Sequence, residues 1–192
     1  MLGAIVLAAG SSKRFGGDKR RVKLNDEFSV LSKTIDNVAN LVDSVLVVLR
    51  VDDQGFKNEL RNQVPSLNVS YYLAPDSALG MGHSLSNAIN TQDNLTAAMI
   101  VLADMPFVQR KSIELLISTY MAHADSTPIV IPTLQGRFGH PVIFDQVYFE
   151  EMSQLKGDRG AKPIIEAHKD KIITIELEDL GTIRDIDTPR DF

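Results

Sequence analysis

The chain of 192 residues has no cysteine and no tryptophan, and it contains fewer basic than acidic residues. The absence of cysteine excludes disulfides, thiolate metal ligands and cysteine nucleophiles. A formal net charge of −5 argues against nucleic acid as the main partner, because that role needs a basic face. The apolar stretch Leu2–Ala9 is too short for a signal or membrane-spanning segment. We therefore expect a cytoplasmic protein with no membrane or nucleic-acid partner.

Apolar runs and helical patterns alternate along the chain. The apolar runs predict strands at Ala4–Ala8, Ser44–Leu49, Val69–Leu73, Ala97–Ala103, Pro128–Ile131 and Ile172–Ile175. Helical spacing predicts helices at Val30–Leu41, Phe56–Gln63, His83–Thr91, Lys111–His123 and Ala161–His168. This alternation predicts one α/β domain over residues 1–192, with a doubly wound, mainly parallel, Rossmann-like sheet and helices on both faces. Ligands bind such sheets at the carboxyl ends of the strands.

The loop after the first predicted strand is rich in glycine and basic residues. Within Lys13–Lys23 six Lys or Arg accompany one acid, a balance of +5 that leaves −10 for the rest of the chain. Gly10 and Gly16 let backbone N–H groups approach phosphate oxygens, and Arg14 and Lys19 supply charge. The spacing is that of neither a Walker A loop nor a dinucleotide fingerprint. Two interpretations stay open, a polyphosphate-binding loop and a solvated basic surface loop.

Aspartates near two further loops are candidate metal ligands. Asp104 ends a buried run and precedes Met-Pro, which places a carboxylate at the ligand edge, where it could bind Mg²⁺. The alternative is that Asp104 caps the following helix. Near the end of the chain, Asp185 and Asp187 have strand spacing and point the same way. Asp187 also precedes Thr-Pro and could instead cap a last helix.

A second glycine pair precedes the helix predicted at His83–Thr91. Gly80 and Gly82 allow the backbone to approach a flat ring, and the helix start near His83 offers free N–H donors. The alternative is an ordinary glycine turn before a helix. From the residues alone, the ordinary glycine turn is favoured.

Several segments in order resemble the signatures of the molybdenum cofactor nucleotidyltransferases, or MobA-like NTP transferases. The first loop matches L-A-A-G-x-S-x-R-F-G followed by Lys, and later segments match L-A-D-M-P, G-x-x-G-H-P, G-D-x-G-A-K and D-I-D-T-P. The matches span residues 7 to 189, nearly the whole chain. The chain therefore resembles this family throughout, and the resemblance implies a nucleotide-diphospho-sugar-transferase type of fold.

The resemblance also implies roles for individual residues. Catalytic roles fall on Arg14, Lys19 and Asp104, and metal ligation on Asp104 and Asp187, with Asp185 as a further candidate. Nucleotide binding falls on Leu7, Ala8, Ala9, Gly10, Ser12, Gly16, Lys19, Gly80, Gly82 and Ser84. Acceptor binding falls on Gly139, His140, Pro141 and Lys162. Lys162 stands where the family has Arg, and a lysine cannot make the bidentate hydrogen bonds of a guanidinium. For His140 the alternative is a residue that only steadies its loop.

Two segments favour one base. Relatives that use GTP carry L-A-G-G in the first loop, whereas those that use CTP carry L-A-A-G and a G-x-(G/S)-x-S-L segment. This chain has Ala9 in the first loop and Gly-Met-Gly-His-Ser-Leu at residues 80–85. The resemblance is therefore closest to the CTP:molybdopterin cytidylyltransferases.

The implied reaction transfers CMP from CTP to the terminal phosphate of molybdopterin or molybdenum cofactor, with Mg²⁺ as cofactor and pyrophosphate as product. A molybdoenzyme or its chaperone is a further implied partner. Three alternatives remain: guanylyl transfer, a polyol or sugar phosphate as acceptor, and a binding or insertion module without turnover. The family frame favours Lys19 over Lys23 for the α-phosphate. The other basic residues of the first loop, Arg20, Arg21 and Lys23, have no role in the family pattern, and we expect them to be solvated.

Overall fold

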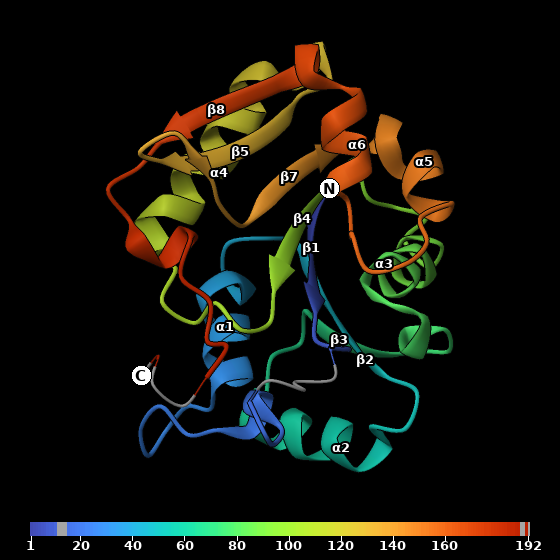
Figure 1. Ribbon diagram of the computed structural model, residues 1–192, viewed down its shortest axis with the longest axis vertical. Coiled ribbons are helices and arrows are strands. Elements are labelled where there is room, and N and C mark those ends of the chain that lie inside the picture. The colour runs from blue at the N-terminus through green and yellow to red at the C-terminus, as the bar shows by residue number, and fades with distance from the viewer. Residues whose placement is uncertain (11–14, 189–190, 192) are drawn as a thin grey trace.

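The computed structural model describes residues 1–10, 15–188 and 191. Within these residues an eight-stranded sheet has the order β3-β2-β1-β4-β7-β5-β6, and β8 pairs with β5 (Figure 1). The strands are β1 (Leu2–Leu7), β2 (Ser44–Arg50), β3 (Val69–Ala74), β4 (Ala97–Leu102), β5 (Ile129–Leu134), β6 (Arg137–Phe138), β7 (Val142–Asp145) and β8 (Ile172–Glu176). The helices are α1 (Val30–Ala39), α2 (Gln54–Gln63), α3 (Met81–Ile89), α4 (Arg110–His123), α5 (Phe149–Ser153) and α6 (Lys162–Ala167).

The sheet is mainly parallel, which confirms the predicted class. β1 pairs in parallel with β2 and β4, and β2 with β3. α1, α2 and α3 are the crossovers that return the chain to the edge where each strand begins. β7 runs antiparallel to both β4 and β5. All six predicted strands and all five predicted helices are present. The short elements β6, β7 and α5 were not predicted. β7 begins directly after Pro141, in a segment that was assigned to a site.

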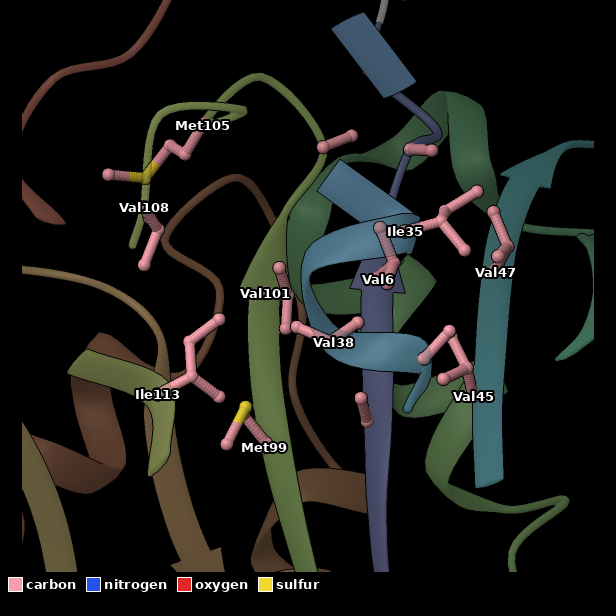
Figure 2. Packing of buried hydrophobic residues seen from close by; sticks show 14 of the residues in the cluster. Val6, Ile35, Val38, Val45, Val47, Met99, Val101, Met105, Val108 and Ile113 are labelled. Atoms are coloured by element: carbon pink, nitrogen blue, oxygen red, sulfur yellow. The ribbon is translucent and has the colours of Figure 1, made fainter. Parts of the chain in front are cut away.

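Two apolar cores lie on the two faces of the sheet. On one face, Val6 and Val101 pack against Val38 of α1 and Ile113 of α4 (Figure 2). On the other face, the alternate residues of β1 and β4, such as Ile5 and Ile100, pack with α3, α5 and α6. Successive strand residues thus enter opposite cores, and this explains why the strands are apolar at consecutive positions.

Parallel pairing brings the carboxyl ends of β1, β2 and β4 to one edge of the sheet. The described segments that follow these strand ends are residues 8–10 and 15–21, 51–53 and 103–109. Figure 1 shows the short blue helix of residues 19–21 below the arrowheads of β1 and β4, near the descending C-terminal segment. No helix in the described ranges is both long and apolar enough to cross a membrane.

Candidate functional site

Three carboxylates meet at the carboxyl edge of the sheet. Asp104 follows β4, and Asp185 and Asp187 come from the C-terminal segment; one oxygen of each lies within 4.8 Å of the others. The backbone N–H of Ile186 donates to the carbonyl of Asp104 at 2.9 Å, which fixes the two segments side by side. Carboxylate oxygens are the ligands that Mg²⁺ and Mn²⁺ prefer. The donor set therefore fits a divalent cation, and it includes Asp185.

Lys19 reaches into this carboxylate cluster. Its Nζ lies 2.6 Å from Oδ2 of Asp104 and 3.4 Å from Oδ1 of Asp187. Burial alone would lower the pKa of Lys19, but the hydrogen bonds and charges of the two aspartates outweigh it and raise that pKa. Lys23 is exposed and its backbone pairs with Ser29. Lys19 is thus the lysine that the structure places at the carboxylates.

A buried aspartate anchors the C-terminal segment that carries Asp185 and Asp187. The carboxylate of Asp179 accepts hydrogen bonds from the N–H of Gln109 at 2.8 Å and from the hydroxyl of Ser112 at 2.7 Å. Gly181 packs so closely on the carbonyl of Phe107 that a Cβ would clash. These contacts hold residues 179–187 against the loop after β4, and so bring together aspartates that are distant in sequence.

Asp104 does not cap the helix that follows it. The helix after Asp104 begins only at Arg110, with Gln109 as its N-cap residue. In the C-terminal segment it is the carboxylate of Asp191 that accepts the N–H groups, from Asp187 at 3.0 Å and Thr188 at 2.6 Å. The alternative of a capping role is therefore wrong for Asp104.

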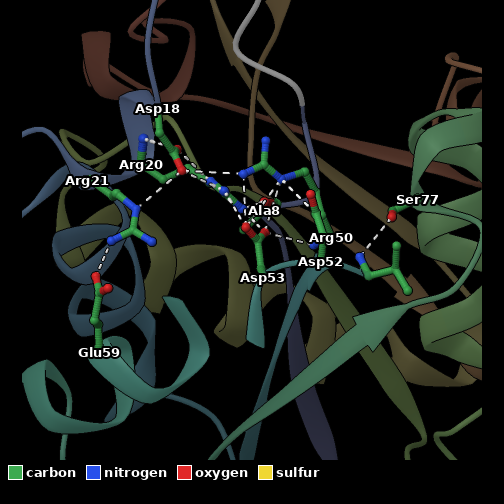
Figure 3. A network of polar contacts seen from close by, with 10 residues as sticks. Ala8, Asp18, Arg20, Arg21, Arg50, Asp52, Asp53, Glu59 and Ser77 are labelled. Carbon is green, nitrogen blue, oxygen red and sulfur yellow. Dashed lines mark hydrogen bonds and ion pairs between the residues drawn. The ribbon is translucent and has the colours of Figure 1, made fainter. Parts of the chain in front are cut away.

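A second charged cluster is centred on Arg20 and lies at the ends of β1 and β2 (Figure 3). Arg20 is only 3% exposed. Its Nη1 donates to the carbonyl of Ala8 at 2.7 Å, its Nε and Nη2 donate to Asp18 at 2.7 Å each, and Nη2 also donates to Asp53 at 3.0 Å. Arg50, at the end of β2, donates to the same Asp53 carboxylate at 2.9 Å. The expectation that Arg20 is solvated is wrong, because two carboxylates enclose its guanidinium.

The charges of this cluster hold each other in the ionised state. Burial alone would raise the pKa of Asp53, but hydrogen bonds from Arg20 and Arg50 outweigh it and lower that pKa to about 2. In the same way burial would lower the pKa of Arg20, and its bonds to Asp18 and Asp53 raise it instead. The outer neighbour Arg21 is exposed, stacks on the ring of Phe56 at 4.2 Å and pairs with Glu59.

Gly80, the N-cap residue of α3, and Gly82, in its first turn, pack against another predicted segment. Gly80 has a φ of +119°, and a Cβ there would lie 2.5 Å from the carbonyl oxygen of Gly157. The N–H of Gly82 donates to the same oxygen at 2.7 Å. Ser84 is buried, and its hydroxyl donates to the carbonyl of Gly80 at 3.3 Å. The predicted nucleotide segment is thus braced by the loop that leads to Lys162, the first residue of α6.

The predicted acceptor residues Gly139, His140 and Pro141 lie beside the C-terminal segment. A Cβ on Gly139 would lie 2.5 Å from the carbonyl of Thr182, and the N–H of His140 donates to that carbonyl at 2.7 Å. The His140 ring lines a small, mainly apolar cavity between β4, α1 and α4, and burial lowers its pKa. These contacts fit a residue that steadies its loop.

Four predicted nucleotide residues, Leu7, Ala8, Ala9 and Gly10, lie at the end of β1. Leu7, Ala8 and Ala9 are buried, and Gly10 is exposed. Gly16 has a φ of +75°, which favours glycine. Ser12 and Arg14 lie outside the described residues.

The prediction from sequence missed Arg20, Arg50 and Asp53. Asp53 follows β2 directly, at the same edge as Asp104, so its place after a parallel strand was a usable signal. The loop after β2 carries no family motif, and it was not among the places singled out for ligands.

Comparison with known proteins agrees with this arrangement. Residues 4–172 match the model of the MobA-like NTP transferase domain. The chain belongs to the MobA-like NTP transferase family. It is therefore an enzyme of the nucleotidyltransferase class.

Two relatives in this comparison differ in their names and coverage. Purine catabolism protein PucB from Bacillus subtilis is 27% identical over 196 residues, covering 98% of this chain and 92% of the relative. A protein named probable molybdenum cofactor guanylyltransferase, from Natranaerobius thermophilus, is 26% identical over 136 residues, covering 70% of this chain and 62% of the relative.

Solved structures support the fold over almost the whole chain. A homologue of Rv0371c from Mycobacterium sp. strain JC1 is 26% identical, with a TM-score of 0.80 over 99% of this chain and 92% of that one. Rv0371c from Mycobacterium tuberculosis, in a complex with manganese, is 21% identical, with a TM-score of 0.75 over 99% of this chain and 95% of that one.

Proposed function

We propose that this family member transfers CMP from CTP to the terminal phosphate of a molybdopterin-type acceptor and releases pyrophosphate. The observation that carries nucleotidyl transfer is the meeting of Lys19 with Asp104 and Asp187 at the carboxyl edge. A triphosphate needs cations on both sides, and this edge offers an ammonium together with oxygen ligands for a divalent cation.

The chain's residues would act mainly by positioning and by neutralising charge. Lys19 would exchange its carboxylate partners for phosphate oxygens, and backbone N–H groups near Gly10 and Gly16 would bind the leaving pyrophosphate. Asp104, Asp187 and Asp185 would hold Mg²⁺, which supplies charge neutralisation at the α-phosphate. The phosphate of the acceptor is already ionised, so no side chain has to remove a proton from it.

Sequence supports CTP as the donor, through Ala9 in the first loop and the Gly80–Leu85 segment. The relative named as a guanylyltransferase supports GTP as the second candidate. Turnover with CTP and with GTP, at equal concentration and with the same acceptor, separates the two. We expect kcat/KM to be at least about tenfold higher with CTP than with GTP. Such a ratio needs a difference of only ~1.4 kcal/mol in the binding of the two transition states. A preference for GTP would overturn the choice of base.

The acceptor is tested by following pyrophosphate release with a panel of substrates. The panel contains molybdopterin, molybdenum-loaded molybdopterin and several polyol and sugar phosphates, each with all four NTPs and Mg²⁺. We expect release with a molybdopterin-type acceptor. Release only with a polyol or sugar phosphate would change the acceptor and leave nucleotidyl transfer intact. No release with any pair would favour a binding module without turnover.

A further inference from the structure

Two consecutive basic residues of the first loop point to different partners. Lys19 and Arg20 both belong to the short 3-10 helix η1 (Lys19–Arg21), which Asp18 caps by accepting the N–H of Arg20 at 3.2 Å. Lys19 reaches the carboxylates of Asp104 and Asp187. The guanidinium of Arg20 turns instead toward the ends of β1 and β2, as Figure 3 shows.

We propose that Arg20 is a positioning residue of the transfer reaction, which acts through Lys19. Its bonds to the Ala8 carbonyl and to Asp53 tie η1 to the ends of β1 and β2, and this fixes where the next side chain places its ammonium. This inference rests on the proposed function, because positioning matters only if Lys19 holds phosphate. A shift of a charged group by about 1 Å is enough to slow a reaction strongly.

The chemistry of this contact requires a guanidinium. Arg20 uses Nε, Nη1 and Nη2 to bind two carboxylates and one carbonyl that lie around it in different directions. A lysine ammonium keeps the charge but offers its three donors from a single point, so it cannot reach all three partners at once. Arg20→Lys should therefore hold η1 less firmly than Arg20 and more firmly than an uncharged side chain.

Arg21 provides a matched control on the same turn. Like Arg20 it lies over the ring of Phe56 and beside Asp18, but it is exposed and pairs with Glu59. Arg21→Met removes the same charge from the same turn and leaves the bonds to Ala8 and Asp53 in place. A general effect of loop charge would appear in both variants, whereas positioning through Arg20 would appear in only one.

The first measurement needs no substrate. Lysines are acylated under limiting reagent, and the labelling of Lys19 is quantified by mass spectrometry relative to Lys33, whose pair with Asp36 lies on α1. We expect Lys19 labelling to rise about threefold or more in Arg20→Met, to rise less in Arg20→Lys and to stay unchanged in Arg21→Met. If Arg20→Met does not fold, all its lysines become reactive together, and Arg20→Lys then decides. Unchanged Lys19 labelling in every folded Arg20 variant overturns the proposal.

The second measurement is a double-mutant cycle on pyrophosphate release. If Arg20 acts through Lys19, Arg20→Met should lower kcat about tenfold in the wild-type background and less than about twofold in the Lys19→Met background. Equal losses in both backgrounds would show that Arg20 acts independently of Lys19. If no nucleotide gives pyrophosphate release, the proposed function is wrong, and the acylation of Lys19 alone then tests whether Arg20 positions it. Strong release with unchanged labelling would defeat the positioning role alone.

Discussion

Two charged clusters share one edge of the sheet, and their charges are balanced differently. The cluster of Lys19 has one ammonium and three carboxylates among the described residues, and its side chains remain partly exposed. The cluster of Arg20 has two guanidiniums, those of Arg20 and Arg50, and two carboxylates, and Arg20 is buried. The first has excess negative charge, whereas the second is neutral as a whole.

This difference separates a site that binds ligands from one that holds the fold. At an accessible edge, a cation from solution can bind the excess carboxylates and neutralise their charge, as a metal site requires. In the second cluster the central pair, Arg20 and Asp53, is buried and each charge has a partner of opposite sign, so no ligand is needed. Removal of one partner leaves an uncompensated buried charge. The predictions below alter one cluster at a time and begin with the largest expected effect.

Asp104→Asn should lower the rate of nucleotidyl transfer about 10³-fold or more, because a lost carboxylate removes several kcal/mol of electrostatic stabilisation. Pyrophosphate release with saturating CTP and Mg²⁺ measures this. Asp52→Asn is the control, since Asp52 is 79% exposed and lies outside the carboxylate cluster. A folded Asp104→Asn variant with more than about a tenth of wild-type activity contradicts the assignment.

Asp53→Ala should lower the free energy of unfolding by about 3 kcal/mol, because it leaves Arg20 buried with one carboxylate fewer. Urea unfolding measures the loss. Asp52→Ala changes the adjacent exposed carboxylate and should cost no more than about 0.5 kcal/mol. Equal losses in these two variants would mean that the Asp53 carboxylate contributes no more to the free energy of unfolding than the exposed carboxylate of Asp52.

The contribution of Asp53 to stability should also shrink in acid. Its pKa is lowered from 3.8 to about 2 in the folded protein, so the stabilisation is complete above about pH 5 and is lost as the pH falls toward 2. The difference in unfolding free energy between wild type and Asp53→Ala should therefore shrink by roughly 2 kcal/mol between pH 5 and pH 2. Urea unfolding over this range measures it, and a constant difference contradicts the role of the ionised carboxylate.

Arg21→Met should have the smallest effect, a loss of unfolding free energy below about 1 kcal/mol, because an exposed ion pair and an exposed ring contact are weak. The loss should become smaller still at high salt, where the pair with Glu59 is screened. Unfolding at low and high sodium chloride concentration checks this. A loss as large as that of Asp53→Ala would remove the distinction between the two arginines.

The sequence predicted the open cluster better than the buried one, for a physical reason. Asp104 follows a long apolar run, and such a strand end must lie at the ligand edge. The burial of Arg20 depends on Asp53, which lies 33 residues away in another loop. A run of Lys and Arg after two glycines has the composition of a solvated loop, so only the packing of β1 beside β2 reveals that Arg20 is enclosed.

The sheet shows the same limit. The long strands were predictable because their apolar runs fill two cores, whereas β7 has only four residues and follows Pro141 within a segment that has its own motif. The place of Asp185 in the carboxylate cluster also depends on packing, because the contact of Ile186 with Asp104 sets which oxygens meet.

Binding of Mn²⁺ to wild type, Asp104→Asn and Asp53→Asn tests the central distinction most directly. Free Mn²⁺ is followed by electron paramagnetic resonance during a titration of each protein. The account predicts that Asp104→Asn loses binding and keeps its thermal stability, whereas Asp53→Asn loses stability and binds Mn²⁺ as wild type does. Unchanged binding in Asp104→Asn, or lost binding in a folded Asp53→Asn protein, would contradict it.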